Sequence, residues 1–280
     1  MIDSWEFLQT EIDAASQQQI PYTIAPGRYY INQPLQLKTN AIISGNGPNF
    51  STVIQPNNCQ AFVIDGDNVI GGWAFKNNIK NLTIDSSTTE INELIKINKT
   101  YSTEINNVFI FNQKTNIGVN ITNSNFIIIN NSILNGTNTT IESGIIVNGI
   151  ENNTSVVLNN VDIENYSRGL KTIGDSNTDL HSCYMERCIV NIDIFNDSSV
   201  NLFGGFFKSI NGYNIGLRSN NFNVYSAKLE SYNGTRLNGK IIYCFERKYQ
   251  NVSIKGVKSY PGYLNNTNCP KTLFENAHIL

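Results

Sequence analysis

The sequence predicts an all-β fold, a right-handed single-stranded parallel β-helix with an N-terminal capping α-helix. Asn makes up 45 of the 280 residues and recurs beside short runs of Ile, Val and Phe, a composition that favours many short strands joined by tight corners. Strand-like segments also recur at a constant offset of 22 residues in the second half of the chain, which indicates a solenoid. A helical pattern is confined to the first 20 residues.

Four segments carry the 22-residue repeat. They begin at Leu158, Leu180, Leu202 and Val224. A second apolar column consists of Ile163, Met185, Phe207 and Leu229. Between these columns lies a small-to-medium column of Val161, Cys183, Gly205 and Ala227. A narrow solenoid interior must hold side chains from every coil, so we expect residues 161 and 163 inside and residues 162 and 164 outside.

Other repeat architectures fit the pattern less well. Helical repeats would show apolar residues three and four apart over ten or more positions, whereas these segments are short β-branched runs broken by Asn and Gly. A four-stranded propeller blade needs about 40 residues, close to twice the observed period.

One helix is expected at the start of the chain. Asp3 as N-cap and Glu6 three residues later form a capping box. Trp5, Leu8, Ile12 and Ala15 follow at helical spacing. Because a solenoid exposes its end coil, such a helix would act as a lid.

We expect a single β-helix domain over residues 1–280. The capping helix occupies residues 1–20. Residues 21–155 form irregular coils with loops, because looser copies of the strand pattern recur there at larger offsets. Regular 22-residue coils follow in residues 156–235, and terminal coils in residues 236–280.

A series of short motifs follows the expected helix. It runs YTIAPGRYYI at residues 22–31, PLQL at 34–37, IISGNG at 42–47 and TVI at 52–54. The series resembles the opening of the pectate-lyase-like (pectin lyase fold) superfamily, particularly the branch with phage tailspikes and polysaccharide depolymerases. In that branch a capping helix precedes a PxGxY strand and a GxG turn. The detailed match covers roughly the first 55 residues, and the repeat carries the architecture to about residue 235.

The resemblance implies a protein that binds or depolymerises a bacterial surface polysaccharide, often as a homotrimer on a virion tail. A virion or extracellular location is therefore expected, although the N-terminus lacks a signal-peptide pattern. The chain is shorter than a full tailspike and shows no separate trimerisation region in its sequence. The motif is specific for the fold and weak for the reaction, since one fold hosts many functions.

The aligned strands predict two outward rows. The first row consists of Asp162, Tyr184, Phe206 and Lys228, and the second of Glu164, Glu186, Lys208 and Glu230. Stacked strands lie about 4.8 Å apart, so Glu164 and Glu186 would match the separation of about 5 Å in a retaining glycosidase. Asp162 and Glu186 lie on a diagonal of about 7–8 Å, and Glu186 and Glu230 about 9.6 Å apart, both within reach of an inverting pair. Asp162, Glu164 and Glu186 are the catalytic candidates.

The remaining outward residues suit substrate binding. Tyr184 and Phe206 offer apolar ring faces for sugars, and Arg187 and Lys208 can hold an acidic sugar. Lys228 and Glu230 complete the polar face. A lyase would need a base and a cation, for which Arg168, Arg187 and Lys208 are candidates. Outward Glu and Lys are also typical of a solvated solenoid face. The alternatives are therefore a non-catalytic carbohydrate-binding or adhesion protein and a structural spike.

Several other ligand classes are not indicated. A net charge of −2 without a basic stripe argues against a nucleic-acid partner. The sequence contains no run of 18 apolar residues, so we expect no membrane insertion. We expect no cofactor and no metal site. Asp175, Asp179 and Asp193 lack the spacing of a calcium loop, and the five cysteines form no ligand or disulfide pattern.

Two further features concern the surface. His181 is expected at a corner of the coil and not as a general base. The segment Phe126-Ile127-Ile128-Ile129 is apolar at every position, so one of its faces needs a cover, either a neighbouring chain of a trimer or a folded-back loop.

Overall fold

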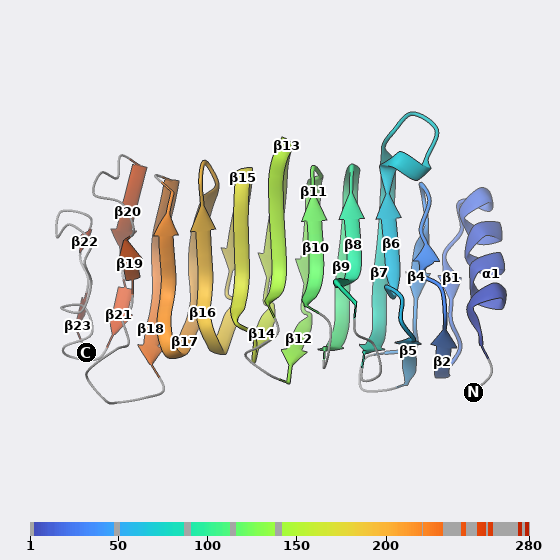
Figure 1. Ribbon diagram of the computed structural model, residues 1–280, viewed down its shortest axis with the longest axis horizontal. Coiled ribbons are helices and arrows are strands. Elements are labelled where there is room, and N and C mark those ends of the chain that lie inside the picture. Colours follow the sequence, from blue (N-terminus) through green and yellow to red (C-terminus); the bar gives the residue numbers. More distant parts are fainter. Residues whose placement is uncertain are drawn as a thin grey trace.

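The computed structural model describes residues 3–47, 51–86, 91–112, 116–137, 142–219, 221–231, 242–244, 251–255, 257–259, 274–275 and 278–279. Over these residues the chain forms one helix, α1, and a continuous sheet of 23 strands, in which every paired strand is parallel to its neighbour. The strands stack along one long axis with α1 at the N-terminal end (Figure 1). This is the right-handed parallel β-helix that the repeat predicts.

Each coil contributes strands to three faces, which we call A, B and C. Face A holds β3 (Leu35–Gln36), β6 (Phe62–Asp65), β8 (Glu93–Asn98), β10 (Ile117–Thr122), the first parts of β13 (Ser143–Asn159) and β15 (Arg168–His181), the last parts of β16 (Tyr184–Phe195) and β17 (Ser199–Arg218), and β19 (Ile242–Cys244).

Face B holds β1 (Tyr22–Thr23), β4 (Ile42–Ser44), the first parts of β7 (Ala74–Asp85) and β9 (Thr100–Asn112), β11 (Asn125–Asn130), the last parts of β13 and β15, the first parts of β17 and β18 (Asn221–Ser231), β20 (Asn251–Lys255) and β22 (Phe274–Glu275).

Face C holds β2 (Gly27–Ile31), β5 (Thr52–Pro56), the last parts of β7 and β9, β12 (Ile133–Gly136), β14 (Asp162–Glu164), the start of β16, the middle of β17, the end of β18, β21 (Val257–Ser259) and β23 (His278–Ile279). A short 3-10 helix, η1 (Gly66–Asn68), follows β6. Of the predicted terminal coils, only β19 to β23 are described, and the rest of residues 236–280 lies outside the described residues.

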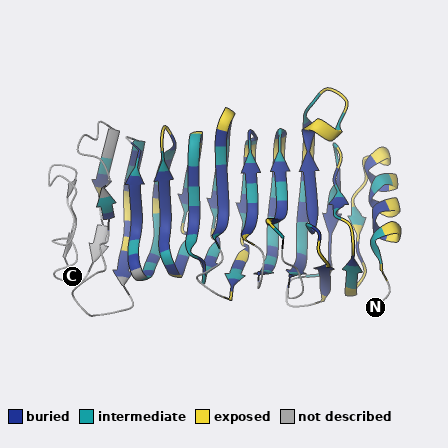
Figure 2. Cartoon of the chain, viewed as in Figure 1, coloured by how far each residue is buried: buried dark blue, intermediate teal, exposed yellow. Residues whose placement is uncertain are grey.

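The register of the regular coils is the predicted one. Leu158 pairs with Leu180, Leu180 with Leu202, and Leu202 with Val224. The looser upstream segments join the same columns, since Ile84 pairs with Ile110, Ile110 with Leu134, and Leu134 with Ile163. Figure 2 shows the resulting buried positions in the strands from the α1 end to β18. Two-residue alternation therefore sets which side chains face outward.

The tight corner between faces B and C explains part of the Asn content. Asn131, Asn160 and Ser182 occupy equivalent positions there with positive φ of 48°, 52° and 53°. Asn tolerates this left-handed backbone better than other non-glycine residues. The side chains also stack, because Asn160 Nδ2 donates to Asn131 Oδ1 at 3.0 Å.

The helix α1 spans Trp5–Gln18 and contacts β1, β2, β3 and β4, so it closes the end of the solenoid. Leu8 and Ile12 are buried against the first coils, as expected. The predicted N-cap was wrong by one residue: the cap is Ser4, and it makes no side-chain capping bond. The reason is that Asp3 still bridges to Tyr30 in extended conformation, although its carboxylate accepts from Trp5 N at 3.0 Å. No helix among the described residues is long and apolar enough to cross a membrane.

Candidate functional site

Three carboxyl groups meet on face C where β14 and β16 run side by side. Asp162 pairs in register with Tyr184, and Glu164 with Glu186. Val161 and Ile163 are buried in the core, so their alternation turns Asp162 and Glu164 to the outside. The first two catalytic candidates thus lie on one strand and the third lies on the next coil.

The protonation of Asp162 is strongly perturbed by its surroundings. Burial, followed by the negative charges of Glu164 and Glu186, raises the pKa of Asp162 to about 7. Its Oδ1 is buried and has no hydrogen-bond partner. Its neighbour in the preceding coil is the apolar side chain of Ile133. A carboxyl group in such surroundings holds its proton near neutral pH.

Glu164 and Glu186 share one arginine. Arg187 Nη1 lies 3.9 Å from Glu164 Oε2, and Arg187 Nε lies 3.7 Å from Glu186 Oε1. The pKa of Glu164 is raised by partial burial and by Glu186, while Arg187 lowers it. Arg187 has a left-handed backbone with φ of 56°, which places its side chain beside the carboxylates of two coils. The guanidinium thus offsets the repulsion within the glutamate pair.

The two predicted rows continue toward the C-terminus in register. Tyr184 pairs with Phe206 and Glu186 with Lys208, and these pair in turn with Lys228 and Glu230. Lys228 Nζ lies 2.7 Å from Glu230 Oε1 and 5.2 Å from the centroid of the Phe206 ring. The residues predicted to bind substrate are therefore brought together on one face.

The aromatic pair differs in orientation from the flat platform we expected. Tyr184 and Phe206 stack on each other with centroids 5.1 Å apart and planes 22° apart. The two rings turn faces toward one another, so ring edges and not open ring faces border this part of face C.

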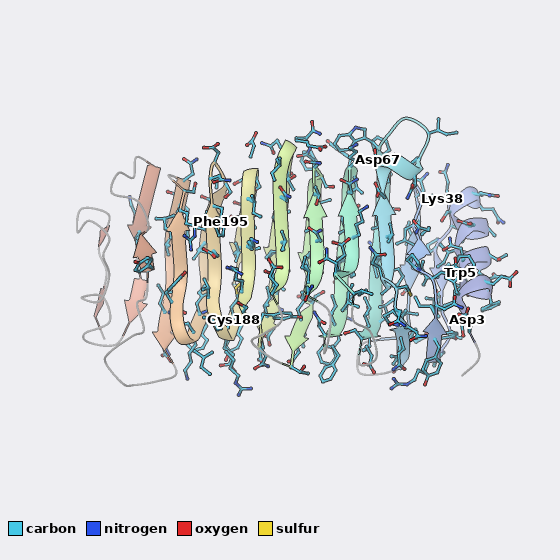
Figure 3. All side chains as sticks on the ribbon, in the orientation of Figure 1. Asp3, Trp5, Lys38, Asp67, Cys188 and Phe195 are labelled. Carbon is cyan, nitrogen blue, oxygen red and sulfur yellow. The ribbon has the colours of Figure 1, made fainter. Side chains whose placement is uncertain are left out.

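Arg168 lies elsewhere. It begins β15 on face A, where its Nε contacts Asp193 Oδ2 at 2.9 Å. Arg168, one of the three alternative cations for a lyase, is therefore on a different face from Arg187 and Lys208, because the chain turns a corner after Glu164. Asp193 is fully buried and also lies 3.5 Å from Arg218 Nε. The Arg218 guanidinium lies 4.8 Å from the centroid of the Phe195 ring, and Figure 3 labels Phe195 at the end of β16.

The other singled-out residues have structural partners. Asp179 accepts a hydrogen bond from Asn201 Nδ2 at 2.8 Å, and Asp175 one from Asn153 Nδ2 at 3.3 Å. Over the part of the chain that the structure describes, no three His, Cys, Asp or Glu residues are grouped to hold a metal ion. His181 stands at a corner, as expected, and stacks on Phe203. Three cysteines are buried free thiols, namely Cys59, Cys183 and Cys188, and Cys269 lies outside the described residues.

The upstream part of face C adds residues that the repeat did not identify. Phe109 and Ile133 precede Asp162 in its row, and Phe111 and Asn135 precede Glu164. The rings of Phe109 and Phe111 meet edge to face with centroids 5.9 Å apart. An apolar flank thus borders the carboxyl cluster on one side and a charged flank on the other. Only the irregular upstream offsets hid this continuity in the sequence.

Comparison with known proteins places this architecture in context. Residues 3–193 match the profile of the family described as rhamnogalacturonase A/epimerase, pectate lyase-like. No curated protein matches the chain by sequence.

Solved structures share the fold at low sequence identity. The surface adhesin PfbA of Streptococcus pneumoniae is 12% identical with a TM-score of 0.71, over 99% of this chain and 78% of the adhesin structure. A mutant tailspike of E. coli bacteriophage HK620, in complex with a pentasaccharide, is 11% identical with a TM-score of 0.67, over 99% of this chain and 61% of the tailspike. The catalytic domain of Agl-KA is 14% identical with a TM-score of 0.64, over 92% of this chain and 51% of that domain.

Proposed function

The chain belongs to the rhamnogalacturonase A/epimerase, pectate lyase-like family, and we propose that it is a tailspike-like protein that binds and depolymerises a bacterial surface polysaccharide. The observation that carries the proposal is the carboxyl cluster of Asp162, Glu164 and Glu186. One member, Asp162, has a pKa of about 7, while an arginine accompanies the other two. Carboxyl groups with different protonation tendencies are what acid–base hydrolysis requires.

Glycoside hydrolysis assigns a role to each group. Asp162 keeps its proton near neutrality and donates it to the leaving oxygen as general acid. Glu186 lies on the diagonal from Asp162 at about 7–8 Å, a separation that leaves room for a water attacking from the opposite face of the sugar. Glu186 is then the general base and the stereochemistry inverts. Glu164, in register with Glu186, stabilises the positive charge that develops on the sugar ring.

Residues around the cluster position the glycan. Arg187 contacts both Glu164 and Glu186, and Lys208 follows Glu186 in its row. Both can bind a carboxylate of an acidic sugar. If the substrate is acidic, the same cations support elimination by a lyase, with Glu164 or Glu186 as the base. The distinction lies in the product, because elimination leaves an unsaturated sugar and hydrolysis does not.

A homotrimer on a virion tail, or an extracellular location, belongs to the same proposal. It is supported by the fold shared with a phage tailspike and a bacterial surface adhesin. A non-catalytic adhesin or a structural spike is the second candidate, favoured by one observation. Glu164 and Glu186 are each within 4.0 Å of Arg187, an arrangement that also serves a purely structural surface.

The test is incubation with a panel of capsular and O-antigen polysaccharides, followed by sizing of the products and measurement of absorbance from unsaturated sugars. We expect one glycan to be shortened. If the wild type shortens none but still binds one, the adhesin candidate replaces the depolymerase. If it neither binds nor cleaves any of them, the carbohydrate proposal fails for that panel.

A further inference from the structure

An exposed row of aromatic side chains lies away from the carboxyl cluster, at the corner where face A turns into face B. Phe75, Tyr101 and Phe126 come from three successive coils. They are 43%, 43% and 58% exposed. The ring centroids are 6.2 Å apart between Phe75 and Tyr101, and 4.8 Å apart between Tyr101 and Phe126. We call these three residues the aromatic ridge.

Phe126 occupies this position against its backbone preference. Its φ is +58°, a left-handed conformation that is unfavourable for a bulky side chain, at a corner where Lys76 and Ser102 of the preceding coils also have positive φ. The neighbouring residues hold it there, because Phe126 N donates to Ser155 Oγ at 2.9 Å and Ile127 is buried in the core. The fold thus keeps a large ring in solvent without the benefit of burial.

The ridge rings also differ in orientation from the other aromatic rows. Successive ridge planes are inclined by 48° and 58°. At the corner between faces B and C, His181, Phe203 and Tyr225 stack with planes only 8° and 1° apart. Parallel stacking covers ring faces, whereas inclined rings leave part of each face open to a ligand.

Uncharged polar side chains continue the ridge along the solenoid. Asn125 pairs with Tyr101, and Ser155 Oγ donates to Asn125 Oδ1 at 3.3 Å. The row then runs through Ser155, Asn177, Ser199 and Asn221, which pair in register. Hydroxyl and amide groups can both donate and accept hydrogen bonds. Charged residues also occur at this corner, since Lys76 follows Phe75 in the chain and Lys99, two residues before Tyr101, pairs with Asp67 at 2.7 Å.

From this arrangement we propose that the aromatic ridge is a second glycan-binding site, separate from the carboxyl cluster, that stacks neutral sugar rings. The coil spacing of about 4.8 Å resembles the length of one sugar unit in an extended glycan, so consecutive sugars meet consecutive rings. The polar row downstream then binds the sugar hydroxyl groups. The inference rests on the proposed function, in that the ligand is a polysaccharide.

A second copy of the chain is a weaker candidate for this surface. Of the apolar segment predicted to need cover, Ile127 and Ile129 point into the core, whereas Phe126 is exposed and Ile128 is partly exposed. Three half-exposed aromatic rings offer roughly 300 Å², well below the approximately 800 Å² that each partner of a stable interface buries. A few sugar rings match the smaller area.

The experiment compares four variants, three single and one double, in affinity electrophoresis through gels that contain dextran, mannan, galactan or polygalacturonate. Phe126→Asn removes the ring while Asn suits the left-handed backbone, so folding is expected to be kept. Tyr101→Ser removes the second ring. Tyr225→Ser is the matched control, because Tyr225 is a similarly exposed aromatic on another corner. Thermal unfolding monitored by circular dichroism checks that these three variants and the Phe126→Asn/Tyr101→Ser double variant fold.

We expect at least one neutral glycan to retard the wild type and Tyr225→Ser. For the double variant Phe126→Asn/Tyr101→Ser, we expect the dissociation constant to be at least tenfold larger. Unchanged retardation of the double variant overturns the ridge site, while cleavage by the wild type would leave the proposed function intact. Retardation by polygalacturonate alone also overturns it. A loss of oligomers in the double variant, seen by sedimentation, reassigns the ridge to a chain–chain contact. Failure of the wild type to bind or cleave any glycan removes both proposals.

Discussion

Glu164 and Glu186 are in-register partners on adjacent coils, and Arg187 reaches both of them. Two acidic side chains placed directly opposite each other destabilise a sheet. The arginine is therefore part of the arrangement that allows both groups to stand on face C.

Replacement of either glutamate tests the catalytic assignment. If Glu186 is the general base, Glu186→Gln should lower kcat about 10²–10⁴-fold with little change in glycan binding. Glu164→Gln should lower kcat as well, since it loses charge stabilisation. Turnover of a purified oligosaccharide and its dissociation constant are the measurements. Glu11→Gln, an exposed position on α1 away from face C, is the control, and full activity of both test variants would exclude them from the mechanism.

The raised pKa of Asp162 makes the stability of the folded protein depend on pH. Its pKa is about 7 in the folded protein, because of burial and the nearby glutamates, against about 3.9 in an unfolded chain. The folded state therefore binds the proton more tightly between these values, and the free energy of unfolding falls as pH rises from about 4 to 7. This loss of unfolding free energy, which we call the Asp162 penalty, is complete above about pH 7 and absent below about pH 4.

Asp162→Asn should remove this penalty. We expect the variant to be more stable than wild type at pH 8 by about 1–2 kcal/mol after allowance for solvent screening, and similar to it at pH 4. Urea unfolding at the two pH values measures the difference. Activity should be lost in the same variant, and wild-type activity should decline above about pH 7 as the acid ionises. An active Asp162→Asn protein would contradict the acid role.

Arg187→Gln tests the contacts of Arg187 with Glu164 and Glu186. Without the guanidinium, the repulsion between Glu164 and Glu186 is uncompensated, so the pKa of Glu164 should rise further. Stability at pH 8 should drop by roughly 0.5–1 kcal/mol, and it should recover when Glu164→Gln is added. Thermal unfolding of the single and double variants forms the required cycle. Equal destabilisation with and without Glu164→Gln would show that the arginine acts through packing alone.

Two adjacent glycines provide a matched pair for the coil geometry. Gly205 has φ of +105°, and a Cβ there would lie 2.4 Å from the Cys183 carbonyl oxygen of the preceding coil. Gly204 has φ of +81°, with its nearest neighbour at 3.8 Å. Gly204→Ala should cost about 1–2 kcal/mol from the backbone alone, and Gly205→Ala clearly more. Denaturant midpoints compare them, and an equal effect would argue against close packing at this corner.

The sequence predicted the regular coils well because a single period and one buried column fix both register and direction. Leu158 to Val224 pair as the 22-residue offset indicates. Upstream, coils of unequal length broke the alignment, so the Ile133 neighbour that helps bury Asp162 was not apparent. Arg168 lies on face A because the chain turns a corner between Glu164 and Arg168, and no apolar period marks that corner. The exposure of Phe126 depends on its left-handed backbone, with φ of +58°, which no apolar period marks.

Because the coils stack in register, the length of the β-helix can change by whole coils. Adding or removing one whole 22-residue coil between β17 and β18 would lengthen or shorten the rod by one strand spacing, about 4.8 Å, and leave Glu164 next to Glu186. Adding the same coil between β14 and β16 would move these two glutamates to about 9.6 Å while the hydrophobic column stays continuous. The length of the β-helix and the spacing within the carboxyl cluster can therefore change independently of each other.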